Sequence, residues 1–212
     1  MRRVLRGILL ALAGLVLATG FSVATTTTAS AAGDKIDRFS IEYEMGTDGV
    51  LQAKETIVWR FGSDSGRHGI DRYFVTREPY DDQQDAVYTV DIESVTSPDS
   101  GVATQYSENT YSTDGGRGEE LRIRIGDPDE TISSPTATYV ITYSVTGAMR
   151  TFSGYDEFYW DATGSNWTAP MTDVSVRASV PGGAQDLSCF AGPVQSDQPC
   201  TSKKVTDGVA EF

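Results

Sequence analysis

The sequence predicts an all-β fold, an antiparallel β-sandwich of the immunoglobulin-like or a related type, preceded by a signal peptide. Three observations lead to this prediction. Many short segments alternate apolar and polar residues, which is the period of a half-buried strand. Gly, Pro, Asp and Asn residues that favour turns separate these segments. After the first thirty or so residues, no long run shows the 3.6-residue period of a helix.

The start of the chain has the three parts of an export signal. Residues 2–6 contain three arginines, residues 7–18 are apolar and uncharged, and residues 29–31 are small, as a signal peptidase requires. We expect residues 1–31 to be the signal peptide, cut after Ala31 or, alternatively, Ala32. An uncleaved anchor is the rival interpretation, but the apolar run is shorter than the ~20 residues that span a bilayer. The protein is therefore expected to be exported, to the outer face of the cell membrane or as a secreted protein.

The rest of the chain, residues 37–212, is expected to form one β-sandwich domain, because its length suffices for a core of its own. The whole chain has 30 acidic and 17 basic residues, a formal net charge of −13. Removing the three arginines of the signal makes the charge still more negative. Such a surface repels nucleic acid and anionic lipid, so we expect no nucleic-acid partner.

The two cysteines are expected to form a disulfide. Cys189 and Cys200 are close in sequence, and an even number of cysteines in an exported chain is typical of structural pairing. The segment between them is rich in turn-forming residues. Closing so short a loop contributes on the order of 2–3 kcal/mol to stability.

The first two predicted strands form a hairpin. Residues 37–44 and 51–61 both alternate, and Asp48-Gly49 between them is a turn signal. Glu55 interrupts the apolar side of the second strand. A carboxylate on the inward side indicates either a strand end or a local ion pair, and Arg72 is the candidate partner.

Later segments continue the two-residue period. The clearest strand is 138–145, where every second residue is a large apolar or aromatic one. Residues 102–111 are ambiguous, with an edge strand as the favoured alternative, and residues 203–212 alternate only weakly. The other predicted strands are 87–97, 121–125 and 174–180.

The segment from Tyr155 to Trp167 concentrates aromatic and acidic side chains, and we expect it at the centre of the sandwich. With strand period, Phe158 and Trp160 share the inward face, because two large rings on one face are typical of a sandwich core. The other face is expected to be solvated, and it carries Tyr155, Glu157, Tyr159 and Asp161.

Two functions remain open for this outward face. Tyr155 and Tyr159 can form a platform for a ligand such as a sugar ring. Glu157 and Asp161 can alternatively act as the two carboxylates of a glycosidase. That chemistry needs an acid whose pKa is raised by apolar walls, whereas the alternation places both carboxylates in water. We therefore expect a binding surface with no catalytic residue, with a secreted carbohydrate-binding or carbohydrate-active protein as the alternative.

His68 is the only histidine, so any triad or histidine metal site depends on it. With Arg72, it lies in or near a glycine- and arginine-rich loop, and both are candidate binding residues. The alternative for His68 is a hydrogen bond to backbone. The acidic segments 127–130 and 81–82 are weak candidates for Ca²⁺, because Asp before Pro is more typical of a turn. We expect no metal site and no cofactor.

A series of short motifs runs along the chain in a fixed order. They are Asp48-Gly49-Val50-Leu51, Glu55-Thr56-Ile57, Phe61, residues 67–72, residues 125–129, residues 139–143, residues 157–161 with Gly164 and Trp167, and Val180-Pro181. Together they resemble the N-terminal domain of the YciQ-like predicted bacterial membrane proteins, a domain of unknown function (DUF2207). The resemblance implies an extracytoplasmic β-rich domain followed by transmembrane segments, and it implies no catalytic residue. No apolar run long enough to span a membrane follows these motifs, so we expect a fragment; a short secreted relative is the alternative.

Together, these patterns predict an extracytoplasmic, non-enzymatic domain of a membrane-associated bacterial protein. We expect it to sense or bind an envelope polymer or another extracytoplasmic protein, with membrane attachment through segments absent from this chain. A purely structural spacer is a further alternative.

Overall fold

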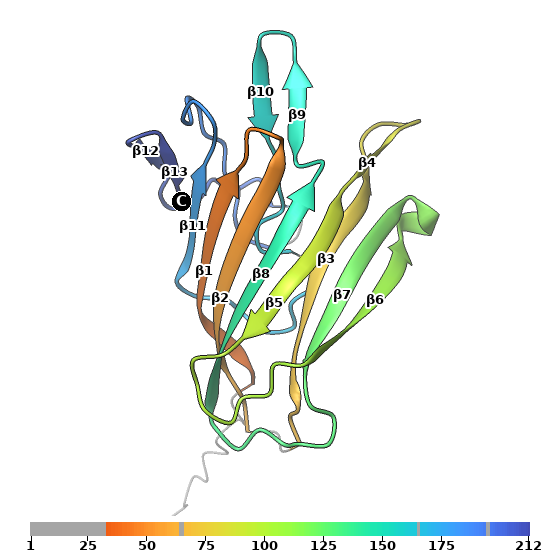
Figure 1. The fold of residues 1–212 in the computed structure, drawn as a ribbon, viewed down its shortest axis with the longest axis vertical. Helices are drawn as coiled ribbons and strands as arrows, with labels where there is room; N and C mark the ends of the chain where they lie inside the picture. Colours follow the sequence, from red (N-terminus) through yellow and green to blue (C-terminus); the bar gives the residue numbers. More distant parts are fainter. Residues whose placement is uncertain (1–32, 64–65, 165, 194–195) are drawn as a thin grey trace, which may run out of the picture. The chain divides into compact units, whose positions relative to one another are not determined.

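Two β-sheets pack against each other in the computed structural model, which describes residues 33–63, 66–164, 166–193 and 196–212 (Figure 1). The prediction of an all-β, sandwich-like fold is confirmed, since none of the described residues lies in an α-helix. No helix that could span a membrane was found in these described ranges. The predicted signal peptide lies outside them.

The larger sheet has seven strands in the order β12-β13-β11-β1-β2-β8-β5. Its first hairpin, β1–β2, is the predicted one, and β8 is the strand predicted most clearly. Unexpectedly, β1 runs parallel to β11, with Phe39 opposite Val174 and Glu44 opposite Ser179. The strands are β1 (Lys35–Met45), β2 (Val50–Arg60), β5 (Thr89–Thr96), β8 (Thr136–Thr146), β11 (Val174–Ser179), β12 (Lys204–Thr206) and β13 (Val209–Glu211).

The smaller sheet has four antiparallel strands in the order β4-β3-β7-β6, and a separate hairpin pairs β9 with β10. The edge strand expected within 102–111 is present as β6. The strands are β3 (Gly69–Pro79), β4 (Asp85–Val87), β6 (Tyr106–Thr113), β7 (Gly118–Gly126), β9 (Met149–Phe152) and β10 (Tyr155–Phe158), with a short 3₁₀ turn η1 (Asp114–Gly116) before β7.

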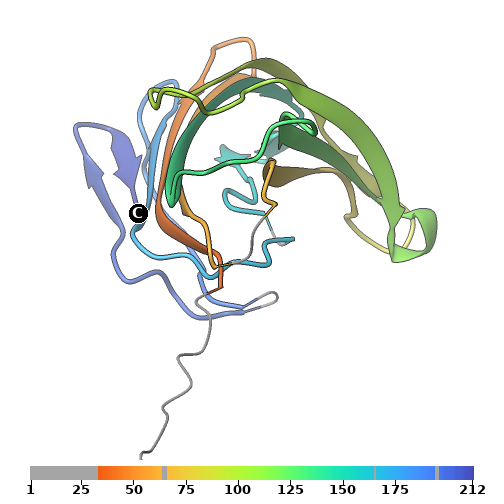
Figure 2. The same ribbon diagram turned by 90° about the horizontal axis from the view of Figure 1, so that it is seen from below.

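Alternate residues of the long strands are buried, as the two-residue period predicts. On β8, Tyr139, Ile141 and Tyr143 are fully buried, and the ring of Tyr143 lies 4.7 Å from that of Phe74 on β3. Figure 2 shows the larger sheet curving around the chain that follows β10. Trp167 in this segment packs edge-on to Phe39 with 5.9 Å between ring centroids, so the segment contributes to the core.

The predicted disulfide between Cys189 and Cys200 is present, with 5.5 Å between the two Cα atoms. The backbone N–H of Cys200 also donates to the carbonyl of Cys189 at 3.1 Å. The disulfide therefore closes a narrow loop after β11, as the spacing indicated.

Among the residues that the structure describes, one ion pair is buried in the core, and it joins the two sheets. Glu55 in the middle of β2 is 0% exposed and Arg72 on β3 is 1% exposed. The Arg72 guanidinium donates from Nε to Glu55 Oε2 at 2.8 Å and from Nη2 to Oε1 at 2.7 Å. Such a bidentate pair is the strongest form of a charged hydrogen bond. The predicted pairing of Glu55 with Arg72 is therefore confirmed.

Other groups complete the hydrogen bonds of this pair. Tyr143 donates its hydroxyl to Glu55 Oε1 at 2.7 Å, and Arg72 donates to the carbonyl of Ala162 at 3.2 Å and to that of Tyr73. Gly164, with φ of +72°, passes so close that a Cβ there would lie 2.6 Å from Arg72 Nη1. The pair thus connects β2, β3, β8 and the segment after β10.

We predict that Glu55→Gln lowers the free energy of unfolding by about 3–5 kcal/mol, because it leaves the buried Arg72 without its counter-charge. Urea denaturation measures the effect. Arg124→Met is the matched control, because Arg124 lies in an exposed pair with Asp71. This substitution should lower the free energy of unfolding by less than about 1 kcal/mol.

Replacing both partners, with Glu55→Leu and Arg72→Met together, should recover much of that loss, because a packed apolar pair avoids burying charge. A Glu55→Gln protein as stable as the parent would contradict this account of the core.

A second prediction concerns alkaline pH. Burial raises the pKa of Tyr139 from 10.0 to about 12, and its hydroxyl has no hydrogen-bond partner among the described residues. Unfolding above pH 10 therefore lets this hydroxyl ionise, so its contribution to stability is complete below pH 10.0 and is lost as pH rises through about 12. Tyr139→Phe should leave the free energy of unfolding at pH 7 unchanged or raise it. It should also make the loss of stability above pH 10.0 less steep.

The control for this prediction is Tyr143→Phe on the same face of β8. It removes a hydrogen bond to the Glu55 carboxylate and should cost about 1.5–3 kcal/mol at neutral pH. Equal destabilisation by the two variants at pH 7 would show that Tyr139 also has a hydroxyl partner.

Candidate binding surface

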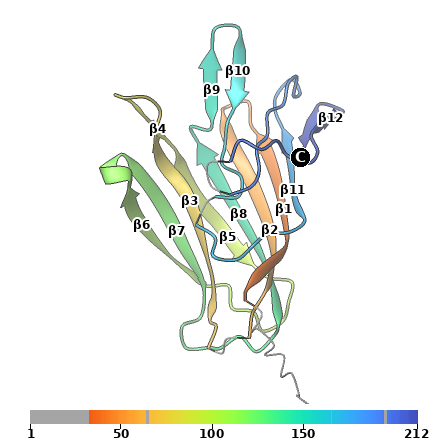
Figure 3. The same cartoon turned by 180° about the vertical axis from the view of Figure 1, so that it is seen from behind.

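The β9–β10 hairpin projects past the ends of the sandwich strands (Figures 1 and 3). Its strands pair only with each other, with Phe152 opposite Tyr155 and Met149 opposite Phe158, and Gly154 takes φ of +103° in the turn. The expectation of a central sandwich strand over this segment is therefore wrong. Alternation indicates which side chains face inward, but it does not specify the neighbouring strand.

The inward residues of the segment nevertheless anchor it to the core. Phe158 lies edge-on to Tyr43 with 5.7 Å between ring centroids, and Trp160 lies edge-on to Tyr88 at 5.2 Å. Both side chains are half-buried. The hairpin is thus held at its base by aromatic packing, while its tip extends into solvent.

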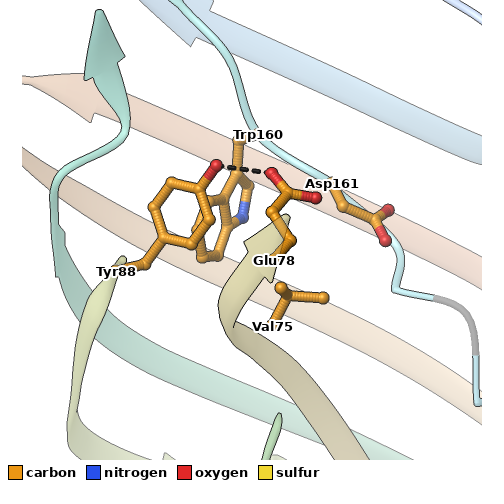
Figure 4. Close-up of a pocket in the computed structure, with 5 residues that line it drawn as sticks. All are labelled: Val75, Glu78, Tyr88, Trp160 and Asp161. Carbon is orange, nitrogen blue, oxygen red and sulfur yellow. Dashed lines mark hydrogen bonds between the residues drawn. The ribbon is translucent and has the colours of Figure 1, made fainter. Parts of the chain in front are cut away.

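Arg150 on β9 organises the base of the hairpin. Its Nη2 donates to the hydroxyl of Tyr88 at 2.9 Å and to Glu78 Oε1 at 3.4 Å. Tyr88 in turn donates to Glu78 Oε1 at 2.6 Å (Figure 4). The guanidinium carbon lies 3.9 Å from the ring centroid of Tyr159 and 5.5 Å from that of Tyr80. Arg150 therefore connects the Glu78–Tyr88 hydrogen bond to the exposed rings of Tyr80 and Tyr159.

The electrostatics keep these hydroxyls protonated and Arg150 charged at neutral pH. Burial, together with the hydrogen bond to Glu78, raises the pKa of Tyr88 to about 12. Partial burial and the nearby Glu78 carboxylate also raise the pKa of Tyr159. Burial disfavours the charge on Arg150, but its contacts with Tyr88 and Glu78 raise its pKa above the ordinary value.

Both tyrosines whose rings lie against the Arg150 guanidinium are exposed, and so is Tyr155 on the same hairpin. The exposed fractions are 51% for Tyr80, 61% for Tyr155 and 45% for Tyr159. Tyr155 stacks on Phe152 with 5.0 Å between ring centroids. We call Tyr80, Tyr155, Tyr159 and Arg150 the tyrosine surface. Tyrosine and arginine are the residue types that dominate binding hot spots.

Glu157 and Asp161, the other predicted residues of the segment, are both exposed, but they lie in different settings. Glu157 is opposite Arg150 in the hairpin. Asp161 accepts the N–H of Gly164 at 3.0 Å and lines a cavity of about 10 Å³ beside Trp160 (Figure 4). That volume holds about one water molecule. Glu157 does not line it, so the two carboxylates do not share this cavity.

The structure places neither His68 nor Arg72 on the tyrosine surface. His68 precedes β3, whereas Glu78 is near its other end, some ten residues or about 30 Å along the strand. The His68 Nδ1 atom lies 2.8 Å from the carbonyl oxygen of Glu130, as the backbone alternative expected. Arg72 is in the buried ion pair and has no exposed face for a ligand.

The acidic segments considered for Ca²⁺ form turns. Asp127 accepts the N–H of Asp129 at 2.8 Å, and Asp81 accepts the N–H groups of Gln83 and Gln84 at 2.7 and 2.6 Å. Across the described ranges, no cluster of three or more His, Cys, Asp or Glu side chains could hold a metal ion.

Sequence reasoning missed Tyr80, Glu78, Tyr88 and Arg150 as members of the site. They belong to separate elements, and only the fold brings them to the hairpin. One signal was available for Arg150: it precedes the aromatic segment by a few residues, so a tight hairpin would place it beside Glu157.

Comparison with known families places the chain. The family described as predicted membrane protein (DUF2207), N-terminal domain, matches residues 35–212. The chain belongs to this family. The resemblance that the sequence motifs indicated is thus confirmed, and the described sandwich, the disulfide and the tyrosine surface all lie within the matched part of this DUF2207 domain.

Further comparisons add little. The comparison with curated proteins found no match for this chain. Among solved structures, the leukotriene A4 hydrolase of Saccharomyces cerevisiae has 8% identity and a TM-score of 0.46, covering 85% of this chain and 26% of its own. A two-domain M1 zinc metallopeptidase bound to L-tryptophan has 13% identity and a TM-score of 0.31, covering 84% and 38%. This chain thus spans well under half of either protein, and both TM-scores are too low to indicate a shared fold.

We predict that Arg150→Met lowers the free energy of unfolding by about 1–2 kcal/mol, because Glu78 and Tyr88 lose a charged donor in a partly buried place. Arg38→Met is the control, since Arg38 forms an exposed pair with Asp173 and should cost less than about 1 kcal/mol. Chemical denaturation compares the two, and equal losses would contradict the structural role given to Arg150.

Proposed function

We propose that this DUF2207 domain is a non-enzymatic interaction domain, which contacts envelope components through the tyrosine surface. The observation that carries the proposal is that Arg150 on the hairpin lies against the exposed rings of Tyr80 and Tyr159. A third exposed ring, Tyr155, lies on the same hairpin, whose base is fixed to the sandwich. Rigid aromatic rings give a large contact area with little loss of conformational entropy on binding. A planar guanidinium adds a donor for polar groups of the partner.

The proposed location is the extracytoplasmic side of the membrane of a bacterial cell. The export signal at residues 1–31 supports translocation. The disulfide between Cys189 and Cys200 supports an oxidising compartment. Membership of a family of predicted membrane proteins supports attachment to the membrane through another part of the protein.

The proposal of binding without turnover rests on the placement of the candidate catalytic groups. A glycosidase needs two carboxylates across a cleft that admits a sugar. Asp161 faces a cavity of only about 10 Å³, and Glu157 lies elsewhere on the hairpin. His68 is held by backbone carbonyls at the far end of β3.

The experiment measures binding of the purified protein to two probes from a bacterial envelope: insoluble cell-wall polymer and solubilised envelope proteins. Tyr155→Ala and Tyr159→Ala should each weaken the binding at least about tenfold, because central aromatic residues dominate hot spots. Both side chains are exposed, so the melting temperature of each variant should change little. Phe190→Ala is the matched control, since Phe190 is 66% exposed on the disulfide loop.

Two results would overturn the proposal. One is binding that is equally strong in the parent, Tyr155→Ala and Tyr159→Ala proteins. The other is turnover of an envelope polysaccharide that Glu157→Gln or Asp161→Asn abolishes, which would instead make the protein a carbohydrate-active enzyme.

A further inference from the structure

The seven-stranded and the four-stranded sheet together have four edge strands. Three of these strands carry features that discourage further pairing. β12 and β4 are only three residues long. β5 is longer, but its register is interrupted between Ile92 and Ser94, and it carries Asp91 and Glu93. Short length, bulges and charges are the usual protections of a sheet edge.

β6 has the fewest of these protections (right side of Figure 1). It has eight residues, contains no proline or lysine, and pairs with β7 in one uninterrupted register from Tyr106 to Thr113. Glu108 is its only charged residue. All its residues except Thr113 are exposed, and no other strand within the described residues pairs with it.

The hydrogen bonds identify which backbone groups face the open side. Gly126 donates its N–H to the carbonyl of Gln105 at 2.8 Å, directly beyond the Tyr106–Ile125 pair. Hydrogen-bonded and non-hydrogen-bonded pairs alternate along an antiparallel ladder. The odd-numbered residues of β6 therefore bond to β7. The even-numbered ones, Tyr106, Glu108, Thr110 and Ser112, direct their N–H and C=O groups to the open side.

We propose that this edge pairs with β6 of a second copy of the chain, antiparallel and centred on Asn109. In this register, Glu108 lies opposite the partner subunit's Thr110, and Tyr106 lies opposite the partner subunit's Ser112. All four residues that face outward then form hydrogen-bonded pairs. Asn109 faces the partner's Asn109 as a non-hydrogen-bonded pair. Two four-stranded sheets become one continuous sheet.

The side chains select this register over its neighbours. Centring the pair on Glu108 would place two carboxylates directly opposite each other, which is destabilising in a strand pair. Centring it on Thr110 would place Tyr106 opposite the partner's Asp114, which has left the strand with φ of +48°. In the register centred on Asn109, no like charges lie opposite each other and all four outward-facing residues are paired, so a second copy satisfies the whole edge.

The first experiment measures the association state of the purified protein by sedimentation velocity, from about 1 µM to about 1 mM, where weak contacts become visible. The parent should form dimers as concentration rises. Thr110→Pro removes an N–H that points away from β7 and is tolerated on an edge, so it should weaken association at least about tenfold. Thr110→Val keeps that N–H and is the matched control.

The second experiment tests the register by cross-linking. Asn109→Cys would place two cysteines opposite each other at a Cα separation of about 4.5 Å, within reach of a disulfide. Ser107→Cys is the control, since its two copies would lie four residues apart along the ladder, about 14 Å. Mild oxidation should give a covalent dimer only with Asn109→Cys. The native cysteines are already paired with each other.

Three outcomes would overturn the proposal: a parent protein that is monomeric at every concentration, equal cross-linking by the two cysteine variants, or association unaffected by Thr110→Pro. A monomer that instead binds a foreign extended peptide along β6 would also reject the second copy as occupant. The tyrosine surface uses other elements, so its binding assay succeeds or fails independently.

Discussion

The fold depends on neutralising one buried positive charge. Arg72 is a fully buried cation, and an isolated charge inside a protein would cost several kcal/mol. Glu55 supplies the opposite charge from the other sheet, and Tyr143 occupies a remaining acceptor position of that carboxylate. The guanidinium carbon also lies 4.3 Å from the ring centroid of Phe74. The two sheets therefore have to meet in one relative position, because only that position pairs these groups.

The same constraint positions the segment that follows the hairpin. Arg72 donates to the carbonyl of Ala162, and Gly164 fits against the guanidinium where a larger residue would clash. Because this segment begins directly after Tyr159 and Trp160, the buried pair also helps to fix the base of the β9–β10 hairpin. The edge-on contact of Trp160 with Tyr88 also holds the base of the hairpin in place.

Two arginines with similar surroundings thus have different consequences. Arg72 and Arg150 both lie against aromatic rings and both contact a glutamate. Arg72 is inside, where such contacts hold sheets together. Arg150 is at the end of the sandwich, where its rings remain open to solvent, and this difference in exposure separates a structural group from a candidate binding group. The β6 edge offers a second contact region on the smaller sheet.

The two-residue period by itself determined the fold class, the β1–β2 hairpin, the buried face of β8 and the exposed tyrosines of 155–159. Local alternation is sufficient for these features because it shows which face of a strand is buried. The interruption at Glu55 even indicated its partner, since a buried carboxylate requires a cation. Only the tertiary structure decided that β1 lies parallel to β11, that β10 leaves the sandwich, and that Glu78, Tyr88 and Arg150 meet. Strand neighbours and direction are set by long-range packing, which alternation within one segment does not encode.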